Sequence, residues 1–331
     1  MPSQPFLPGL FADDPATAKQ RTIRVVSISG GKDSTATALI CLDRYGHDDV
    51  RLLFADTGNE HPITIEYVTE YLPHALHHPI EVLRANFDAE IAAKRKYVVE
   101  NWAAKGVNPV AIDRAVEALQ PTGNPFLDLV VWKGRFPSRR AQFCTQFLKR
   151  DVISVYMLDL MEKNRGTALE CWQGVRKDES AARANLAPTE EAAEGWTIVR
   201  PVLHWTGQQS VDYVQLCDVE LNPLYLKGFA RVGCAPCINS SKQDVWQWQR
   251  MFPEMIDKIA AWEEIAAAAT KRGRTSFFPA PDSEGRGARQ GQNVREFVEW
   301  AKTSRGGYQY DLIKAIPEEP GGCSSLYGLC E

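Results

Sequence analysis

The sequence predicts an α/β protein with an open, mostly parallel, twisted sheet that carries helices on both faces. Two observations predict this class. Short apolar segments alternate with helical patterns as far as Val199. The first of these segments also runs directly into a glycine-rich turn and then a helix, an arrangement typical of nucleotide-binding sheet edges. The alternation ends near Asn222, and beyond it we expect a helical region that carries cysteines.

Turn residues separate the expected elements. Strands are expected at 23–29, 51–55, 80–84, 167–173 and 197–199, and helices at 35–45, 62–71, 89–105 and 151–163. Residues 106–140 are rich in Pro and Gly and are interpreted as an inserted cap or loop region. A further helical stretch is expected over 246–271, a loop over 285–292 and a short cysteine-bearing tail over 321–331.

Composition limits the classes of protein that the chain can belong to. It has 331 residues, 44% hydrophobic and 24% charged, with a net charge of −4. These values are ordinary for a globular protein and argue against a strongly basic nucleic-acid binder, although a local basic patch is compatible with them. No apolar run is long enough to span a membrane, and residues 1–20 lack the pattern of a signal peptide. We therefore expect a cytoplasmic protein with a loose leader at 1–20, a nucleotide-binding domain at 21–230 and a C-terminal region at 231–331.

The segment after the first strand predicts a phosphate cradle. Paired glycines let an anion approach the backbone, and the N–H groups and dipole at the start of the following helix attract its charge. The lysine adds a cation and the serines add hydroxyl groups. The alternative is an ordinary strand–turn–helix corner. The predicted phosphate-binding residues are Ser29, Gly30, Gly31, Lys32, Asp33 and Ser34.

Three further segments carry charge at predicted strand ends or beside a thiol. Asp56, Thr57 and Gly58 follow the second strand and are candidates for binding the nucleoside, with a simple turn as the alternative. Arg140 and Lys149 flank Cys144. We expect these cations to bind phosphate or sulfate and to lower the pKa of the Cys144 thiol, which favours its thiolate form. Arg176 ends the fourth strand and is expected to bind an anion, whereas Arg183 is as well explained by a surface ion pair.

The eight cysteines predict metal or sulfur chemistry, because disulfides are rare in a reducing compartment. Cys234 and Cys237 form a C-x-x-C turn, and Cys144 with Cys323 or Cys330 completes four thiolates. Four thiolates suit a [4Fe–4S] cluster, which we favour, or a structural zinc ion. A redox dithiol is the alternative. The remaining cysteines, Cys41, Cys171 and Cys217, are expected to be core thiols.

From about Arg21 to Glu254 the chain resembles the phosphoadenosine phosphosulfate (PAPS) reductase family, within the PP-loop, adenine nucleotide alpha-hydrolase-like superfamily. The resemblance rests on SGGKDS (29–34), DTGNE (56–60), the stretch 139–149, GVRKDES (174–180) and GCAPC (233–237). It implies an adenine nucleotide site, and in many members a [4Fe–4S] cluster on cysteines placed like Cys144, Cys234 and Cys237. Two features depart from the cluster-bearing reductases: Cys144 is followed by Thr145, and the chain ends in Tyr-Gly-Leu-Cys-Glu rather than Glu-Cys-Gly-Leu-His.

Three functional hypotheses follow from the resemblance. The first is reduction of PAPS or adenosine 5'-phosphosulfate (APS) to sulfite, with Cys330 as nucleophile, Lys32 and Arg176 as catalytic cations and a thioredoxin-like reductant as partner. The preferred metal ligands are then Cys144, Cys234, Cys237 and Cys323. The second is ATP-dependent adenylation and sulfur transfer, with Mg²⁺ and a sulfur donor, to nucleic acid or another acceptor. The third is a non-catalytic nucleotide-binding subunit. The oligomeric state is left open.

Overall fold

The structure is a computed structural model that describes residues 21–180, 183–278 and 293–303 of the 331-residue chain. The expected leader at 1–20, the expected loop at 285–292 and the expected tail with Cys323 and Cys330 lie outside the described residues.

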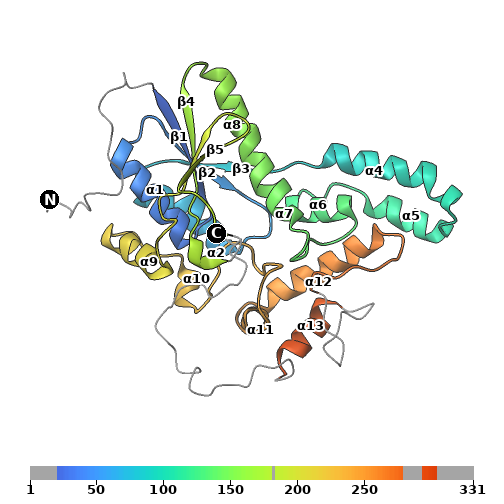
Figure 1. The fold of residues 1–331 in the computed structure, drawn as a ribbon. Coiled ribbons are helices and arrows are strands. Elements are labelled where there is room, and N and C mark those ends of the chain that lie inside the picture. The colour runs from blue at the N-terminus through green and yellow to red at the C-terminus, as the bar shows by residue number, and fades with distance from the viewer. Residues whose placement is uncertain (1–20, 181–182, 279–292, 304–331) are drawn as a thin grey trace.

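The sheet has six strands in the order β3-β2-β1-β4-β6-β5 (Figure 1). The strands are β1 (Thr22–Ile28), β2 (Val50–Ala55), β3 (Ile80–Leu83), β4 (Ala168–Trp172), β5 (Thr189–Glu191) and β6 (Thr197–Val199). Every neighbouring pair is parallel except β5 with β6. The predicted open, mostly parallel sheet is confirmed. The edge strand β5 was not expected, because its sequence Thr-Glu-Glu is fully exposed and has no apolar alternation.

Helices cover both faces of the sheet, as the fold class requires. On one face, α1 (Lys32–Tyr45) and α9 (Gly207–Leu216) pack with a helical segment made of α2 (Pro62–Glu66), a π-helical turn (Tyr67–Tyr71) and α3 (Leu72–Ala75). On the other face lies α8 (Asp151–Lys163). Alternate residues of β1 point to the two faces, so that Val26 belongs to the first core and Val25 to the second.

A third core is helical and lies beside the sheet. It joins α4 (Asp88–Asn101), α5 (Pro109–Ala118), α6 (Pro125–Lys133), α11 (Lys242–Met251), α12 (Pro253–Ala268) and α13 (Val294–Ala301). Segments that are distant in the sequence, 87–148 and 224–298, therefore share one set of buried side chains. In Figure 1, α4, α5 and α6 extend away from the sheet, with α12 alongside.

The structure corrects one expectation about this helical region and refines another. Residues 106–140, expected to be an inserted cap or loop region, contain the helices α5 and α6, so the loop alternative is wrong. Their prolines, Pro109 and Pro125, occupy the first helical position, where a missing N–H costs nothing, and the preceding asparagines cap the helices. The stretch 246–271 is helical as expected, and it comprises two helices, because α11 ends at Met251 and Pro253 starts α12. Among the described residues, no helix is long and apolar enough to cross a membrane.

Glu263 of α12 holds three chain segments together in the helical core. Its carboxylate accepts hydrogen bonds from the Phe277 amide at 2.7 Å, the Ser276 hydroxyl at 3.0 Å and the Val294 amide at 2.8 Å. Burial nevertheless raises the pKa of Glu263 above its usual value. A carboxyl group with a raised pKa in the folded state stabilises the fold while protonated, and that contribution is lost as pH rises through the folded pKa.

We therefore expect the stability cost of Glu263→Gln to be largest below about pH 4.5, the unperturbed pKa, and to decrease as pH rises above it. Urea unfolding of the wild type and the variant at acidic and neutral pH measures this difference. Glu264→Gln is the matched control, because Glu264 is exposed on the same helix. A cost of Glu263→Gln that does not change with pH would contradict the expectation.

Candidate active site

Three loops meet at one edge of the sheet, because the strands that precede them are parallel neighbours. Residues 29–34 follow β1, residues 56–60 follow β2 and residues 173–180 follow β4, in the strand order β2-β1-β4. The contact between the first and third loops is close at Gly174. A Cβ atom at Gly174 would lie 2.6 Å from the Ser34 amide nitrogen and 2.7 Å from the Asp33 carbonyl oxygen. The predicted anion site therefore has two loops packed directly on each other.

The glycine-rich loop forms a compact turn that leads into α1. Gly30 has a φ of +79°, which favours glycine, and a Cβ atom there would also meet Val68 and Thr64. The Ser34 hydroxyl accepts a hydrogen bond from the Ser29 amide at 3.1 Å and donates to the Gly31 carbonyl oxygen at 3.0 Å. Helix α1 begins at Lys32, three residues earlier than expected, so its positive end lies within the loop.

Two residues that were not predicted from the sequence hold this loop from outside. The Tyr225 hydroxyl accepts a hydrogen bond from the Lys32 amide at 3.2 Å, and the Lys32 ammonium lies 5.3 Å from the centre of the Tyr225 ring. The Asn222 side chain donates to the Gly30 carbonyl oxygen at 3.3 Å and to the Thr64 hydroxyl at 3.1 Å. Asn222 also caps the short helix α10 (Pro223–Leu226), which contains Tyr225. In the sequence, the local signal for these two residues is the Asn-Pro pair that starts this helix.

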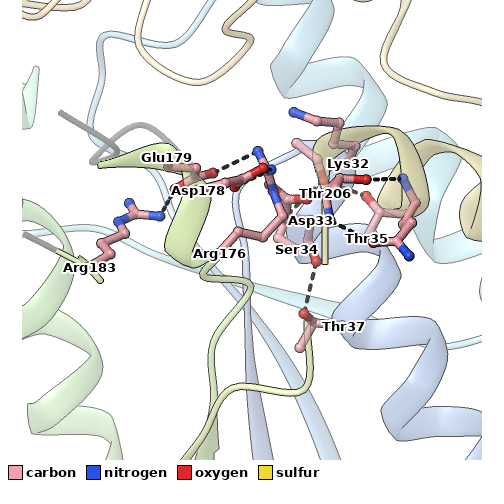
Figure 2. A network of polar contacts seen from close by, with 12 residues as sticks. Lys32, Asp33, Ser34, Thr35, Thr37, Arg176, Asp178, Glu179, Arg183 and Thr206 are labelled. Carbon is pink, nitrogen blue, oxygen red and sulfur yellow. Dashed lines mark hydrogen bonds and ion pairs between the residues drawn. The ribbon is translucent and has the colours of Figure 1, made fainter. Parts of the chain in front are cut away.

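Arg176 is buried and turned toward carboxylates (Figure 2). Its guanidinium donates to Asp33 at 2.8 Å, to Asp178 at 2.5 Å and to Glu179 at 3.3 Å. Arg183 pairs with Glu179 from the other side, so the ion-pair alternative for this residue is found, but the pair is buried rather than at the surface. Asp33 and Arg176 are 0% and 2% exposed in their side chains. Arg176 therefore joins the loop after β4 to the first turn of α1, and its described partners are carboxylates.

The loop after β2 is organised by its own carboxylates. Asp56 accepts a hydrogen bond from the Gly58 amide at 2.8 Å and forms an ion pair with Arg84 at 2.5 Å. The buried carboxylate of Glu60 accepts from the Thr57 hydroxyl at 2.7 Å and from the Thr57 amide at 3.1 Å. Gly58, with a φ of +78°, leaves space for the Asn124 side chain. Asp56, Thr57 and Gly58 thus adopt a fixed turn beside the glycine-rich loop.

The Cys-Ala-Pro-Cys turn is docked on this second loop. Glu60 forms a β-bridge with Cys234, the Ala235 amide donates to the Asn59 carbonyl oxygen at 2.7 Å, and the Asn59 side chain donates to the Pro236 carbonyl oxygen at 3.0 Å. A pocket at this place is lined by Cys144, Cys234 and Cys237 together with Thr57 and Lys149. We call it the thiol pocket.

Burial controls the acidity of these thiols. It raises the pKa of Cys144 to about 11 and that of Cys234 to about 12, while Lys149 acts in the opposite direction on both. The expected acidification of Cys144 by its flanking cations is therefore wrong, because desolvation outweighs the effect of Lys149, and Arg139 and Arg140 are exposed. Cys237 raises the pKa of Cys144, and both Cys237 and Cys144 raise the pKa of Cys234, so two of these thiols ionise together only at a cost.

Polar groups lie close to the sulfur atoms. The Asn239 amide donates to the Cys237 Sγ atom at 3.4 Å, and the Thr57 hydroxyl, which donates to Glu60, lies 3.8 Å from the Cys234 Sγ atom. Within the described residues, no three His, Cys, Asp or Glu side chains converge on a point that could hold a single metal ion. Cys41 and Cys171 lie buried in the two sheet cores and Cys217 packs at the edge of the first, away from the thiol pocket.

The fold and the loop after β1 define a nucleotide-binding α/β protein of the PP-loop class. The family model for the phosphoadenosine phosphosulfate reductase domain matches residues 23–240, and the chain belongs to this family. The chain is also 39% identical over 335 residues to an uncharacterized 37.8 kDa protein in the gpa 5' region of Escherichia phage 186, covering 94% of this chain and 98% of the phage protein.

Similarity to named reductases covers a smaller part of the chain. The adenosine 5'-phosphosulfate reductase of Neisseria meningitidis is 26% identical over 141 residues, which is 40% of this chain and 56% of the reductase. Among solved structures, the PAPS reductase of Candida auris in its phosphate complex aligns with a TM-score of 0.40 at 15% identity, over 66% of this chain and 82% of that chain.

Proposed function

We propose that this protein reduces a sulfonucleotide, PAPS or APS, to sulfite. One observation carries the proposal: the glycine-rich loop after β1 and the thiol pocket are joined through the loop after β2, whose Thr57 lines the pocket. A nucleotide with its phosphates on the glycine-rich loop would then have sulfur-chemistry residues within the same set of loops. Membership of the PAPS reductase domain family supports this assignment.

The residues divide into binding and positioning groups. The N–H groups of the loop and the ammonium of Lys32 would hold the phosphates, and Asp56, Thr57 and Gly58 the nucleoside. Lys149, which lines the thiol pocket, would hold the sulfate. Arg176 would act by fixing Asp33 rather than by touching the anion, because its guanidinium faces three carboxylates. Arg140 lies outside the thiol pocket on an adjoining exposed groove, where it is available to a charged substrate.

The proposed reaction has two steps. The thiolate of Cys330 attacks the sulfur of the sulfonate group, the sulfur–oxygen bond to the nucleotide phosphate breaks, and the nucleotide leaves with that electron pair. The enzyme then carries a thiosulfonate, Cys–S–SO₃⁻. A thioredoxin-like dithiol attacks the cysteine sulfur of this adduct, releases sulfite and resolves the mixed disulfide with its second thiol. The dithiol supplies two electrons and becomes a disulfide, and Cys330 returns to its thiol form.

We further propose that Cys144, Cys234 and Cys237 hold a [4Fe–4S] cluster with Cys323 as fourth ligand. The three thiols line one pocket, and a [4Fe–4S] cluster takes each of its thiolates on a different iron. Donors such as the Asn239 amide at Cys237 are the contacts that tune such clusters. When bound, the cluster would supply iron that can be oxidised and reduced, and a strong local electric field.

Two serine variants test these roles against each other. We expect Cys330→Ser to keep its iron and its nucleotide affinity and to lose sulfite release by several orders of magnitude. We expect Cys323→Ser to lose iron and sulfide. The measurements are iron and sulfide content, and sulfite release from PAPS and APS by anaerobically purified protein with reduced thioredoxin. Full activity of Cys330→Ser would refute its role as nucleophile, and unchanged iron content in Cys323→Ser would refute its role as ligand.

ATP-dependent adenylation and sulfur transfer is the second candidate function. It is favoured by Thr145, which stands where cluster-bearing reductases usually carry a second cysteine. In that case ATP is cleaved between its α and β phosphates, pyrophosphate leaves from the glycine-rich loop and Mg²⁺ neutralises its charge. Pyrophosphate release that depends on a sulfur donor, without sulfite from PAPS or APS, would select this function. Saturable nucleotide binding without either product would select a non-catalytic subunit.

A further inference from the structure

Residues 133–150 form a strongly basic segment in a chain of net charge −4. The segment has six cations and no Asp or Glu. We call these cations the basic strip: Lys133, Arg135, Arg139, Arg140, Lys149 and Arg150. They run from the end of α6 through α7 (Phe143–Thr145) and a π-helical turn (Gln146–Arg150) to the start of α8.

Part of the basic strip lines an open groove that leads into the thiol pocket. The groove is lined by Arg139, Arg140, Gln142, Thr145, Gln146 and Arg150. Gln142 and Thr145 also line the thiol pocket, so the groove and the pocket adjoin. The three arginines are exposed, and no hydrogen bond or ion pair of Arg140 is found among the described residues. An elongated anion in the groove would therefore reach the proposed site of sulfur chemistry.

Aromatic rings lie among these cations. The Lys133 ammonium lies 3.5 Å from the centre of the Trp132 ring and 4.1 Å from that of Phe147. The Arg135 guanidinium lies 5.5 Å from the centre of the Phe143 ring. All three rings are half-buried, so each still presents surface to solvent. Cationic grooves with aromatic rings are typical of proteins that bind single-stranded nucleic acid, because unpaired bases stack on the rings.

Among the described residues, the carboxylates found near the basic strip are fewer than its six cations. Asp151 pairs with Arg150 at 2.9 Å, Glu90 lies near Lys133 and Glu60 lies near Lys149. The cations also act on one another. The pKa of Lys133 is lowered first by burial and then by Arg135, and that of neighbouring Lys94 first by burial and then by Lys133. A ligand with several negative charges would relieve this repulsion.

We propose that the basic strip binds a single-stranded nucleic acid, with phosphodiesters on the arginines and bases on Phe143, Phe147 and Trp132. A sulfonucleotide substrate would use only Lys149 and Arg140 of the basic strip, because the glycine-rich loop serves its phosphates. Lys133, Arg135, Arg139 and Arg150 have no part in that proposed site. Trp132, Phe143 and Phe147 pack partly against the helical core, and unpaired bases can stack on the ring surface that remains exposed, which the paired bases of a closed double helix cannot. This inference goes beyond the proposed reduction of a sulfonucleotide and does not depend on it.

The test measures binding of a fluorescein-labelled 20-nucleotide single strand, as DNA and as RNA, to the full chain by fluorescence anisotropy. The variant is Lys133→Gln/Arg135→Gln/Arg150→Gln, which leaves Lys149 and Arg140 unchanged. The matched control is Lys96→Gln/Lys163→Gln/Arg295→Gln, whose side chains are 75%, 67% and 63% exposed and lie outside the basic strip. Both variants lose three positive charges. Thermal unfolding and nucleotide affinity report that the fold is retained.

We expect the strip variant to bind the single strand at least tenfold more weakly than the wild type at about 50 mM salt. The slope of log affinity against log salt should also become shallower by about 2, because each of the three lost phosphate contacts contributes roughly 0.7 to that slope. The control variant should bind like the wild type. An abasic strand of equal length should bind more weakly than the normal strand, and Phe143→Leu should reduce that difference.

Three outcomes would overturn the inference. An equal loss of affinity in the strip and control variants would indicate binding by net charge alone. Binding of the abasic strand, inorganic polyphosphate or a duplex of equal length as tightly as the normal strand would remove the role of the bases. Finally, binding to phosphatidylserine vesicles with none to either strand would identify a membrane surface instead.

Discussion

Arg176→Met is expected to lower the free energy of unfolding by about 3–5 kcal/mol, because it leaves the buried carboxylate of Asp33 without its ion-pair partner. The same change should weaken the binding of ATP and PAPS at least tenfold, since Asp33 lies in the first turn of α1, within the phosphate cradle. Urea denaturation measures the first effect and titration calorimetry the second. A loss of stability under about 1 kcal/mol would show that the buried pair contributes no more than an exposed one.

The control is Arg21→Met, which removes an arginine from an exposed pair with Asp49. The Arg21 side chain is 60% exposed, and such pairs contribute between about 0 and 1 kcal/mol. The double variant Asp33→Asn/Arg176→Met should recover part of the stability that Arg176→Met loses, since it removes both buried charges of the pair. No recovery would mean that Asp178 and Glu179, rather than Asp33, dominate the effect.

The second large effect is expected for Gly174→Ala. The new methyl group would lie 2.6 Å from the Ser34 amide nitrogen and 2.7 Å from the Asp33 carbonyl oxygen. These are backbone atoms at the start of a buried helix and cannot rotate aside, so the loop after β4 must move away from the glycine-rich loop. We expect a destabilisation of at least about 1–3 kcal/mol, the usual cost of overpacking. Nucleotide affinity should fall by more than tenfold.

Gly106→Ala is the control for a general loss of stability. Gly106 has a φ of +70°, and its added Cβ atom would meet nothing within 4 Å. The substitution should cost about 1 kcal/mol through backbone strain alone and leave nucleotide affinity unchanged. If both alanine variants bind nucleotide like the wild type, the contact at Gly174 does not shape the phosphate cradle.

Local sequence was sufficient for most of the sheet and for the glycine-rich loop. Apolar runs bounded by turn residues identify β1, β2 and β4, because strands buried on both faces need continuous apolar sequence. A strand, two glycines and a helix in that order also locate the phosphate cradle. The helices α5 and α6 were not predicted, because their first-turn prolines resemble loop residues. The strand β5 was not predicted because nothing apolar marks it.

The family, the strand-end loops and the residue types available for chemistry can all be read from the chain before it folds. How these residues are used depends on their three-dimensional neighbours. Arg176 was expected to meet an anion, yet it faces Asp33, which lies 143 positions away along the chain. Cys144 was expected to be acidified by its neighbours, yet burial by the surrounding helices raises its pKa. The physical reason is common to both: turn propensity is local, whereas burial and charge pairing depend on segments that meet only when the chain folds.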